Sequence, residues 1–187
     1  IGGFLRVVVN HHLTFLINSY AHYFGKQNFS DRHSGKDSWI LAFFTYGEGF
    51  HNFHHTFASD YRNGIRAYHW DPAKWLVACL SWVGLASRLN RANPNAIFRA
   101  KLEMDEKRFL AKMAHHARLH AEWNQMIASA RLHLEQVHAR FIDLKTRYRE
   151  IKMDDIRHEM IKAKNDLKVA LVNWSAMVNG SPLPSPA

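Results

Sequence analysis

The sequence predicts an all-α protein in two parts, with a first helical part over residues 1 to 90 and a long helical tail over residues 91 to 179. Apolar and aromatic residues concentrate in helix-length runs before residue 89. No glycine or proline occurs from residue 95 to 179, and one apolar stripe recurs there at alternating steps of four and three residues, which is helical spacing. Polar residues and a proline between positions 90 and 95 separate the two parts.

The first predicted helix covers residues 1 to 20, about the length that crosses a hydrocarbon core, roughly twenty residues. Four polar residues interrupt its apolar character: Arg6, Asn10, His11 and His12. In a membrane span they would face the protein interior or an interface, and a buried helix of a soluble protein is the alternative. Every later Lys and Arg of this part lies beyond His22, so the positive-inside tendency predicts that this end faces the cytoplasm.

Two shorter helices are predicted next. Residues 38 to 46 are too few to span a membrane, and they lead into a histidine-rich segment beneath which such a helix would pack. Residues 73 to 89 carry two tryptophans and a basic residue near each end, which is typical of an amphipathic helix lying in a membrane interface. An ordinary core helix is the alternative. Asp71 followed by Pro72 marks the start of this helix as an N-cap and first helical position.

The tail carries two apolar stripes, over residues 109 to 151 and, in shifted phase, over residues 156 to 174. The first has the spacing of a coiled-coil seam. Two long helices that fold back near residues 153 to 155 are predicted, and a continuous rod that self-associates is the alternative. Residues 180 to 187, rich in proline and serine, are expected to be disordered.

Charge and cysteine content narrow the classes of partner. The formal net charge is +9, but basic residues alternate with acidic ones and no nucleic-acid-reading motif accompanies them, so no nucleic-acid partner is expected. Attraction to anionic lipid headgroups is a better use of the excess. The single Cys79 lies in an apolar run and cannot form an internal disulfide, which agrees with a reducing compartment.

The segment from Gly47 to His55 places three imidazoles, those of His51, His54 and His55, within five residues. Neutral imidazole nitrogens suit divalent iron, zinc and copper. In a helix, the second and third of these histidines lie at i+3 and i+4 from the first, so at least two could reach one metal ion. A solvated polar loop that is rich in histidine is the alternative. A second candidate group, at residues 115 to 120, lacks further ligands and is interpreted as polar positions of a seam.

Four segments together resemble the membrane fatty-acyl desaturases of the stearoyl-CoA (delta-9) type, which are integral membrane di-iron enzymes. They are residues 14 to 22, 47 to 57, 60 to 64 and 68 to 75, and the resemblance covers about the first ninety residues. It implies that the first part is membrane-embedded, with its histidine box on the cytoplasmic side. It also implies iron ligation by His22, His51, His54 and His55, and a metal-bound water held by Asn18.

The resemblance assigns further roles near this centre. Thr14 and Phe15 match positions that line or brace the acyl tunnel, although helix packing accounts equally well for Phe15. Glu48, three residues before His51, is expected to orient a ligand imidazole from the second coordination shell, with a surface salt bridge as the alternative.

The resemblance implies an enzyme that introduces a cis double bond into a fatty acyl-CoA or acyl lipid, using two Fe²⁺ ions, molecular oxygen and an electron donor such as cytochrome b5, ferredoxin or rubredoxin. The two earlier histidine boxes of the family do not occur in this chain, and no His-Pro-Gly-Gly haem motif is present. We therefore expect the chain to be the carboxy-terminal portion of a longer protein, to supply part of the ligands, and to be inactive alone. A non-catalytic membrane-associated helical scaffold and a related di-iron membrane hydroxylase are the alternatives.

Overall fold

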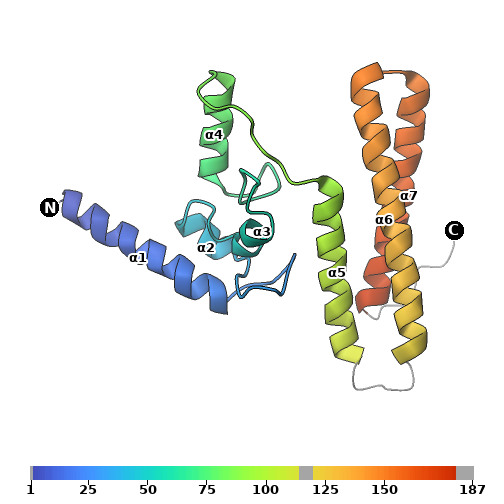
Figure 1. Cartoon of the computed structure of the whole chain (residues 1–187), viewed down its shortest axis with the longest axis horizontal. Helices are drawn as coiled ribbons and strands as arrows, with labels where there is room; N and C mark the ends of the chain where they lie inside the picture. The colour runs from blue at the N-terminus through green and yellow to red at the C-terminus, as the bar shows by residue number, and fades with distance from the viewer. Residues whose placement is uncertain (1, 114–119, 180–187) are drawn as a thin grey trace. The chain divides into compact units, whose positions relative to one another are not determined.

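The structure is a computed structural model, and it describes residues 2 to 113 and 120 to 179, with the side chains of residues 120 to 122 outside that description. These residues form seven α-helices and no β-strand (Figure 1), so the all-α prediction is confirmed. The chain divides into two compact units, Ile1–Asn93 and Pro94–Ala187, which we call unit 1 and unit 2. The predicted disordered end at residues 180 to 187 lies outside the described residues.

Helix α1 (Gly2–Tyr23) covers the predicted first helix and buries only Ala21 near its end. Among the described residues, no helix is both long enough and apolar enough to cross a membrane, so the predicted membrane span at residues 1 to 20 is not found. Arg6 and the polar group from Asn10 to His12 are the physical reason, because they lower the apolarity of a helix whose length alone would suffice.

The turn before helix α3 (His51–Thr56) packs on helix α2 (Trp39–Phe44) through a close backbone approach at Gly49. Ser38 caps α2, because its side chain accepts a hydrogen bond from the N–H of Leu41. A Cβ at Gly49 would lie 2.0 Å from the backbone nitrogen of Ala42, a contact that no side chain could make. Glycine at this position therefore lets the turn before α3 pack directly on α2.

Buried polar groups organise the segment between α3 and α4 (Pro72–Trp82). Asp71 caps α4 at the N–H of Lys74, and Pro72 follows at the first helical position, as predicted. The second carboxylate oxygen of Asp71 accepts from the N–H groups of Asn63 and Gly64. Buried Lys74 donates to the carbonyl oxygens of Gly64, Arg66 and His69. Helix α4 ends at Trp82, well before the predicted residue 89.

An ion pair fixes the other end of this segment. Arg62 donates to both carboxylate oxygens of buried Asp60, at 2.9 and 2.7 Å, and the N–H of Ala92 donates to the same carboxylate. Burial raises the pKa of Asp60, but the bonds from Arg62 and from the backbone outweigh it, so the pKa lies below its ordinary value.

Unit 2 is a bundle of three helices, α5 (Pro94–Met113), α6 (His120–Ile151) and α7 (Asp154–Asn179), that pack on one another. The predicted hairpin is present as α6 and α7, which lie side by side in Figure 1. The sequence predicted one helix through residues 109 to 151, whereas the structure has two. The hairpin turns at Lys152, a non-glycine residue in the left-handed region with φ of 52°.

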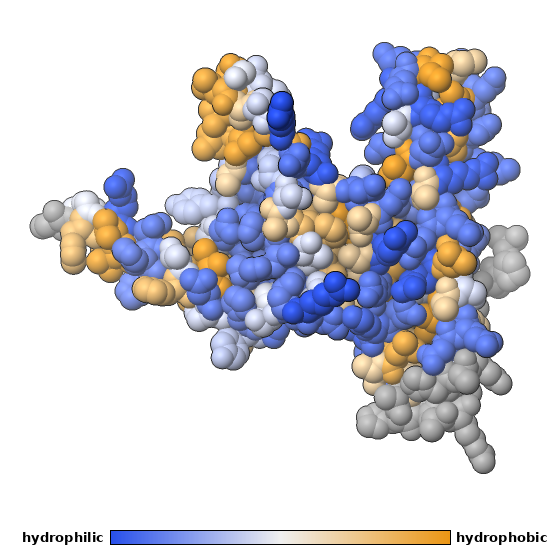
Figure 2. All heavy atoms as spheres, in the orientation of Figure 1, coloured by the Kyte–Doolittle hydropathy of each residue, from blue (hydrophilic) through white to orange (hydrophobic). Residues whose placement is uncertain are grey.

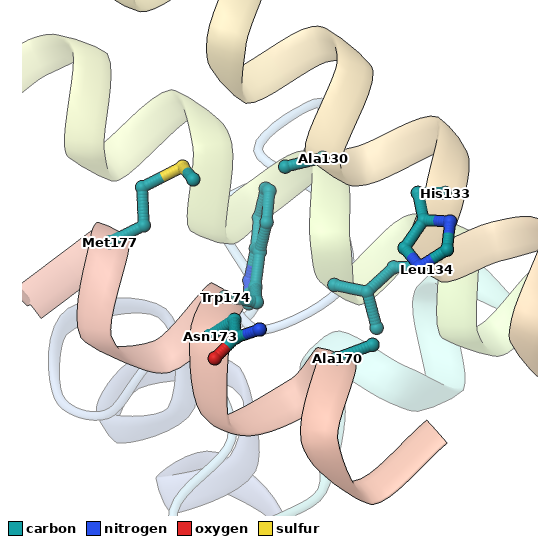
Figure 3. A pocket seen from close by; sticks show the side chains of 7 residues that line it. All are labelled: Ala130, His133, Leu134, Ala170, Asn173, Trp174 and Met177. Atoms are coloured by element: carbon teal, nitrogen blue, oxygen red, sulfur yellow. The ribbon is translucent and has the colours of Figure 1, made fainter. Parts of the chain in front are cut away.

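Apolar side chains from all three helices form the core of unit 2: Leu102, Phe109, Ile127, Leu134, Leu167, Ala170 and Trp174. Small residues on the facing surfaces of α6 and α7 leave a pocket of about 320 Å³ beside Trp174. Figure 3 shows the indole of Trp174 rising from α7 toward Ala130 on α6, with Met177 and Leu134 on either side.

Unit 1, in contrast, exposes many large apolar side chains. Figure 2 shows them gathered over α4 and at intervals along α1. Phe4, Trp39, Trp82 and Leu85 each keep at least three quarters of their surface exposed. Extended apolar surface of this kind marks a contact with a partner or a lipid phase.

Candidate metal centre

Two helices deliver the histidines of the candidate centre. His22 lies in the last turn of α1 and its Nδ1 is 2.7 Å from the hydroxyl oxygen of Ser34. His51, His54 and His55 all lie on α3, so the segment is a short helix rather than the alternative polar loop. The rings of His22 and His51 lie 5.0 Å apart, centroid to centroid, although the two residues are distant in the sequence.

The i, i+4 pair of α3 is in direct contact. The Nε2 atoms of His51 and His55 lie 3.0 Å apart, so one ring donates a proton that the other accepts. His51 is buried, whereas His55 is exposed and His54 half-buried. The Nε2 atoms of both residues therefore point toward each other.

Asp37 holds the start of α3 in place. One of its carboxylate oxygens accepts hydrogen bonds from the N–H groups of Asn52 and Phe53, at 2.9 and 3.1 Å. These are first-turn donors that lack partners within a helix, and a carboxylate there is favoured by the helix dipole. Burial raises the pKa of Asp37, and its hydrogen bonds oppose the increase. A residue outside α3 thus sets the direction of the histidine helix.

Asn52 joins the preceding loop to the same helix. Its fully buried side chain accepts from the N–H groups of Phe29 and Ser30 and donates to the carbonyl oxygens of Ser30 and Gly35. These four bonds fold the loop of residues 24 to 38, which we call the 24–38 loop, across α3. The spacing of the histidines gives no indication of this role, because Asn52 is only a polar residue that lies between two of them.

The 24–38 loop adds a fifth imidazole that the sequence analysis missed. The ring of His33 lies 5.2 Å from that of His55, and its Nε2 is 3.2 Å from the hydroxyl oxygen of Thr56. His33 has no periodic relation to His51 and lies in a polar segment, so only its residue type could have marked it as a candidate.

The environment favours the neutral form of three of these histidines, His33, His51 and His55. Burial, followed by the charges of neighbouring imidazoles, lowers the pKa of His51 to about 4. The same causes, in the same order, lower the pKa of His33 and that of His55. Neutral imidazole is the form that binds a metal ion. The electrostatics therefore suit ligation at ordinary pH.

The donor atoms of the cluster are imidazole nitrogens, which are of the kind that bind transition-metal ions. Nδ1 of His33, His51 and His54 is buried without a hydrogen-bond partner, and an unpaired buried polar atom of this type calls for a ligand or an ion. Two imidazoles on one tetrahedral ion, with metal to nitrogen bonds of about 2.1 Å, place their ring centroids about 5 Å apart. The measured separations run from 4.4 to 6.4 Å among His22, His51 and His55.

The side chains as they lie do not enclose an ion. In the described parts of the chain, no group of three or more His, Cys, Asp or Glu side chains has the arrangement of a complete metal site. The contact between His51 and His55 explains part of this, since their Nε2 atoms bond to each other. Rotation about χ2, a soft torsion, would redirect them toward a shared ion.

The remaining predicted site residues lie on α1 and beside α2. Asn18 is exposed one helical turn before His22, on the same side of α1. Thr14 donates to the carbonyl oxygen of Asn10, and Phe15 is 63% exposed. Glu48 accepts a hydrogen bond from the side chain of Asn63 at 2.8 Å. The roles of these residues toward water, acyl chain and imidazole stay predictions.

Helical segments that gather several imidazoles define a class, that of helical proteins with the nitrogen donors of a metal centre. Comparison with known proteins narrows this class. The chain is 48% identical over 112 residues to acyl-CoA desaturase 1 of Saccharomyces cerevisiae, covering 60% of this chain and 22% of that protein. It is 44% identical over 105 residues to a probable acyl-CoA desaturase of Schizosaccharomyces pombe, covering 56% of this chain and 22% of that protein.

A third relative is human stearoyl-CoA desaturase 5, 33% identical over 92 residues, which are 49% of this chain and 28% of that protein. No family model matches the sequence. The homologues of this chain are acyl-CoA desaturases, and its similarity to them is that of a partial delta-9 desaturase sequence. The chain spans less than a third of the length of these relatives.

Proposed function

We propose that this chain is part of an acyl desaturase that introduces a cis double bond into a fatty acyl-CoA or acyl lipid. Similarity to acyl-CoA desaturases supports the reaction class. One observation supports particular residues as the site: the ring of His22, from α1, lies close to those of His51 and His55, from α3.

In this proposal His22, His51, His54 and His55 are iron ligands, and Asn18 holds a metal-bound water. An iron pair supplies the oxidising power for removing two hydrogens from unactivated methylenes when molecular oxygen and electrons are provided. The chain supplies part of the ligands of that pair, and the other ligands lie outside it. Cytochrome b5, ferredoxin or rubredoxin is the proposed class of electron donor.

The chain's own residues position and protect the ligands. Asp37 and Asn52 fix the direction of α3, and Phe53 fills the space beneath it, almost fully buried. Burial of His51 excludes water from one side of the centre and keeps its imidazole neutral. Thr14 and Phe15, each about two helical turns before His22, are proposed to border the acyl chain.

The exposed apolar surface of unit 1 supports membrane association. Trp75 and Trp82 on α4, together with the apolar positions of α1, would contact lipid in a protein that takes its substrate from the bilayer. We propose that the histidine centre faces the cytoplasm and that unit 2 is a separate helical module that can self-associate.

The proposal is tested by lipid analysis in a host that lacks its own desaturase and carries the complete reading frame for this chain. His54→Ala should reduce unsaturated product at least a hundredfold, because it removes a metal ligand. His158→Ala, which changes an exposed imidazole on α7, is the matched control and should leave product unchanged. Normal product from His54→Ala would remove the histidine box from catalysis. A hydroxylated rather than unsaturated product would favour the related hydroxylase.

A further inference from the structure

The hydrogen bond of His33 to Thr56 determines which of its two ring nitrogens carries the proton. The hydroxyl of Thr56 donates its proton to the carbonyl oxygen of Asn52 at 2.7 Å, a short bond within α3. The hydroxyl oxygen is then an acceptor toward Nε2 of His33, 3.2 Å away. Nε2 of His33 therefore carries the proton, and in the neutral ring Nδ1 carries the free lone pair.

That lone pair is buried and has no hydrogen-bond partner. A Cβ placed on Gly35 would lie 3.3 Å from Nδ1 of His33 and 3.1 Å from Cδ2 of His51, the ring atom next to its Nε2. The free nitrogen of His33 and the Nε2 edge of His51 thus border the same small space. Gly35 leaves this space open because it has no side chain.

The loop that carries His33 is anchored rather than loosely placed. Asn52 bonds to Ser30 and Gly35 on either side of it, and the carbonyl oxygen of His33 accepts from the side chain of Gln27 at 2.6 Å. Its backbone is therefore held on α3, which also carries His51 and His55. A buried acceptor without a partner is destabilising, and an ion in the adjoining space would remove that penalty.

We propose that His33 is a further nitrogen ligand, through Nδ1, of a divalent transition metal held at His51 and His55. The inference rests on the proposed function, because it places His33 at the same centre. It adds a ligand from the 24–38 loop to those on α1 and α3. Imidazole nitrogen is a suitable donor for iron, zinc and cobalt ions.

The decisive measurement uses Zn²⁺ as a diamagnetic probe on the full chain in detergent. Long-range ¹H–¹⁵N correlation spectra of the histidine rings report which nitrogen is protonated, free or metal-bound. Nδ1 of His33 should move from the free to the metal-bound position in the same titration step as His51 and His55, while Nε2 stays protonated. Movement of His51 and His55 without His33 would overturn the inference and leave the metal centre standing. Absence of change in all three rings would count against both.

Affinity for Co²⁺, followed through its visible absorption, separates ligation from a structural role. His33→Gln keeps a polar group near the Nε2 position, whereas His33→Asn places an oxygen near the Nδ1 position. Ligation through Nδ1 predicts that His33→Gln weakens binding roughly tenfold or more and that His33→Asn weakens it less. The reverse order would show that only the contact with Thr56 matters and would overturn the proposal.

Control experiments accompany the two measurements. His158→Ala removes an exposed imidazole outside the cluster and should leave Co²⁺ affinity unchanged. Circular dichroism checks that each variant folds. Because the spectra with Zn²⁺ use the unsubstituted chain, they decide the question even where a His33 variant fails to fold.

Discussion

The two units are stabilised by different kinds of buried side chain. Among the described residues, every buried polar or charged side chain lies in unit 1: Thr45, His51, Asn52, Asp60, Asp71 and Lys74. Most of the large buried apolar side chains lie in unit 2, including Phe109, Ile127, Leu134 and Trp174. Hydrogen bonds are directional and can orient the imidazoles of a site, whereas a helical bundle needs only apolar surface at the right spacing.

The largest expected effect comes from a substitution in the apolar core of unit 2. Leu134→Asp puts a carboxylate into the bundle core, where the leucine is 1% exposed. We expect a loss of about 5 kcal/mol in the stability of unit 2, from the lost apolar contacts and the buried charge. Circular dichroism and hydrogen exchange should show α5 to α7 unfolded and residues 37 to 56 still protected.

Leu132→Asp is the matched control for that change. Leu132 is 57% exposed on the same helix, so its substitution should alter stability by about 0.5 kcal/mol or less. Equal losses from the two substitutions would mean that the buried seam does not stabilise unit 2.

The next largest effect comes from removing a buried polar side chain of unit 1. Asn52→Ala removes two donors and two acceptors from a fully buried position. We expect a loss of about 3 kcal/mol, because several backbone groups of the 24–38 loop lose their partners. Hydrogen exchange should rise over residues 24 to 57 and not over α6 and α7. Asn173→Ala, at an exposed position of α7, should change neither region.

Ion pairs sharpen the comparison, because the pair of Arg62 with Asp60 in unit 1 is largely buried, whereas the pair of Arg99 with Glu135 in unit 2 is more exposed. Arg62→Gln should destabilise unit 1 by about 2 kcal/mol, since Asp60 is buried and keeps only its backbone partners. Arg99→Gln removes a pair with Glu135 in which the arginine side chain is 67% exposed, and it should change unit 2 by about 0.5 kcal/mol or less. Chemical denaturation of both variants provides the measurement, and similar losses would contradict the expected difference.

The smallest predicted effect is a dependence on pH in the metal-free chain. A lowered histidine pKa means that the unfolded chain binds protons more readily, so stability is full above pH 6.5 and falls as the pH drops toward about 4. His51 should contribute the largest share, with His33 and His55 adding in the same direction. Among the described side chains of unit 2, that of His138 has a pKa lowered by burial.

Hydrogen exchange at pH 7 and pH 5, corrected for intrinsic rates, would measure this difference. Unit 1 should lose protection as the pH falls, and His51→Gln should reduce that loss. A larger loss in unit 2 than in unit 1 would contradict the assignment of the effect to the histidine cluster.

Sequence patterns predicted what depends on local spacing. Helices at residues 2 to 23 and 154 to 179, the cap at Asp71 and the proximity of His51 to His55 all follow from periodicity or from adjacent residue types. The sequence between Met113 and His120 carries no glycine or proline, so it gave no sign that α5 and α6 are separate elements. The turn at Lys152 adopts a positive φ that an ordinary residue rarely takes, so its sequence gives little signal.

What could not be predicted depends on contacts between distant residues. Nothing in its spacing relates His33 to the histidine box, and the bonds of Asn52 to Ser30 and Gly35 join segments that no short pattern connects. The membrane span was predicted from length and resemblance, whereas the polar residues of α1 leave it short of the apolarity required. The approach of His22 to the box was expected from the resemblance and not from periodicity.

The shortness of α3 has a consequence for the order in which the protein folds. Six residues form too few helical turns to persist alone, so α3 becomes stable only when Asp37 and Asn52 close the 24–38 loop on it. That closure requires contacts between residues 15 to 23 positions apart, which form more slowly than those within a helix. We therefore expect the imidazoles to come together late in folding, after α1 and the long helices of unit 2 have formed.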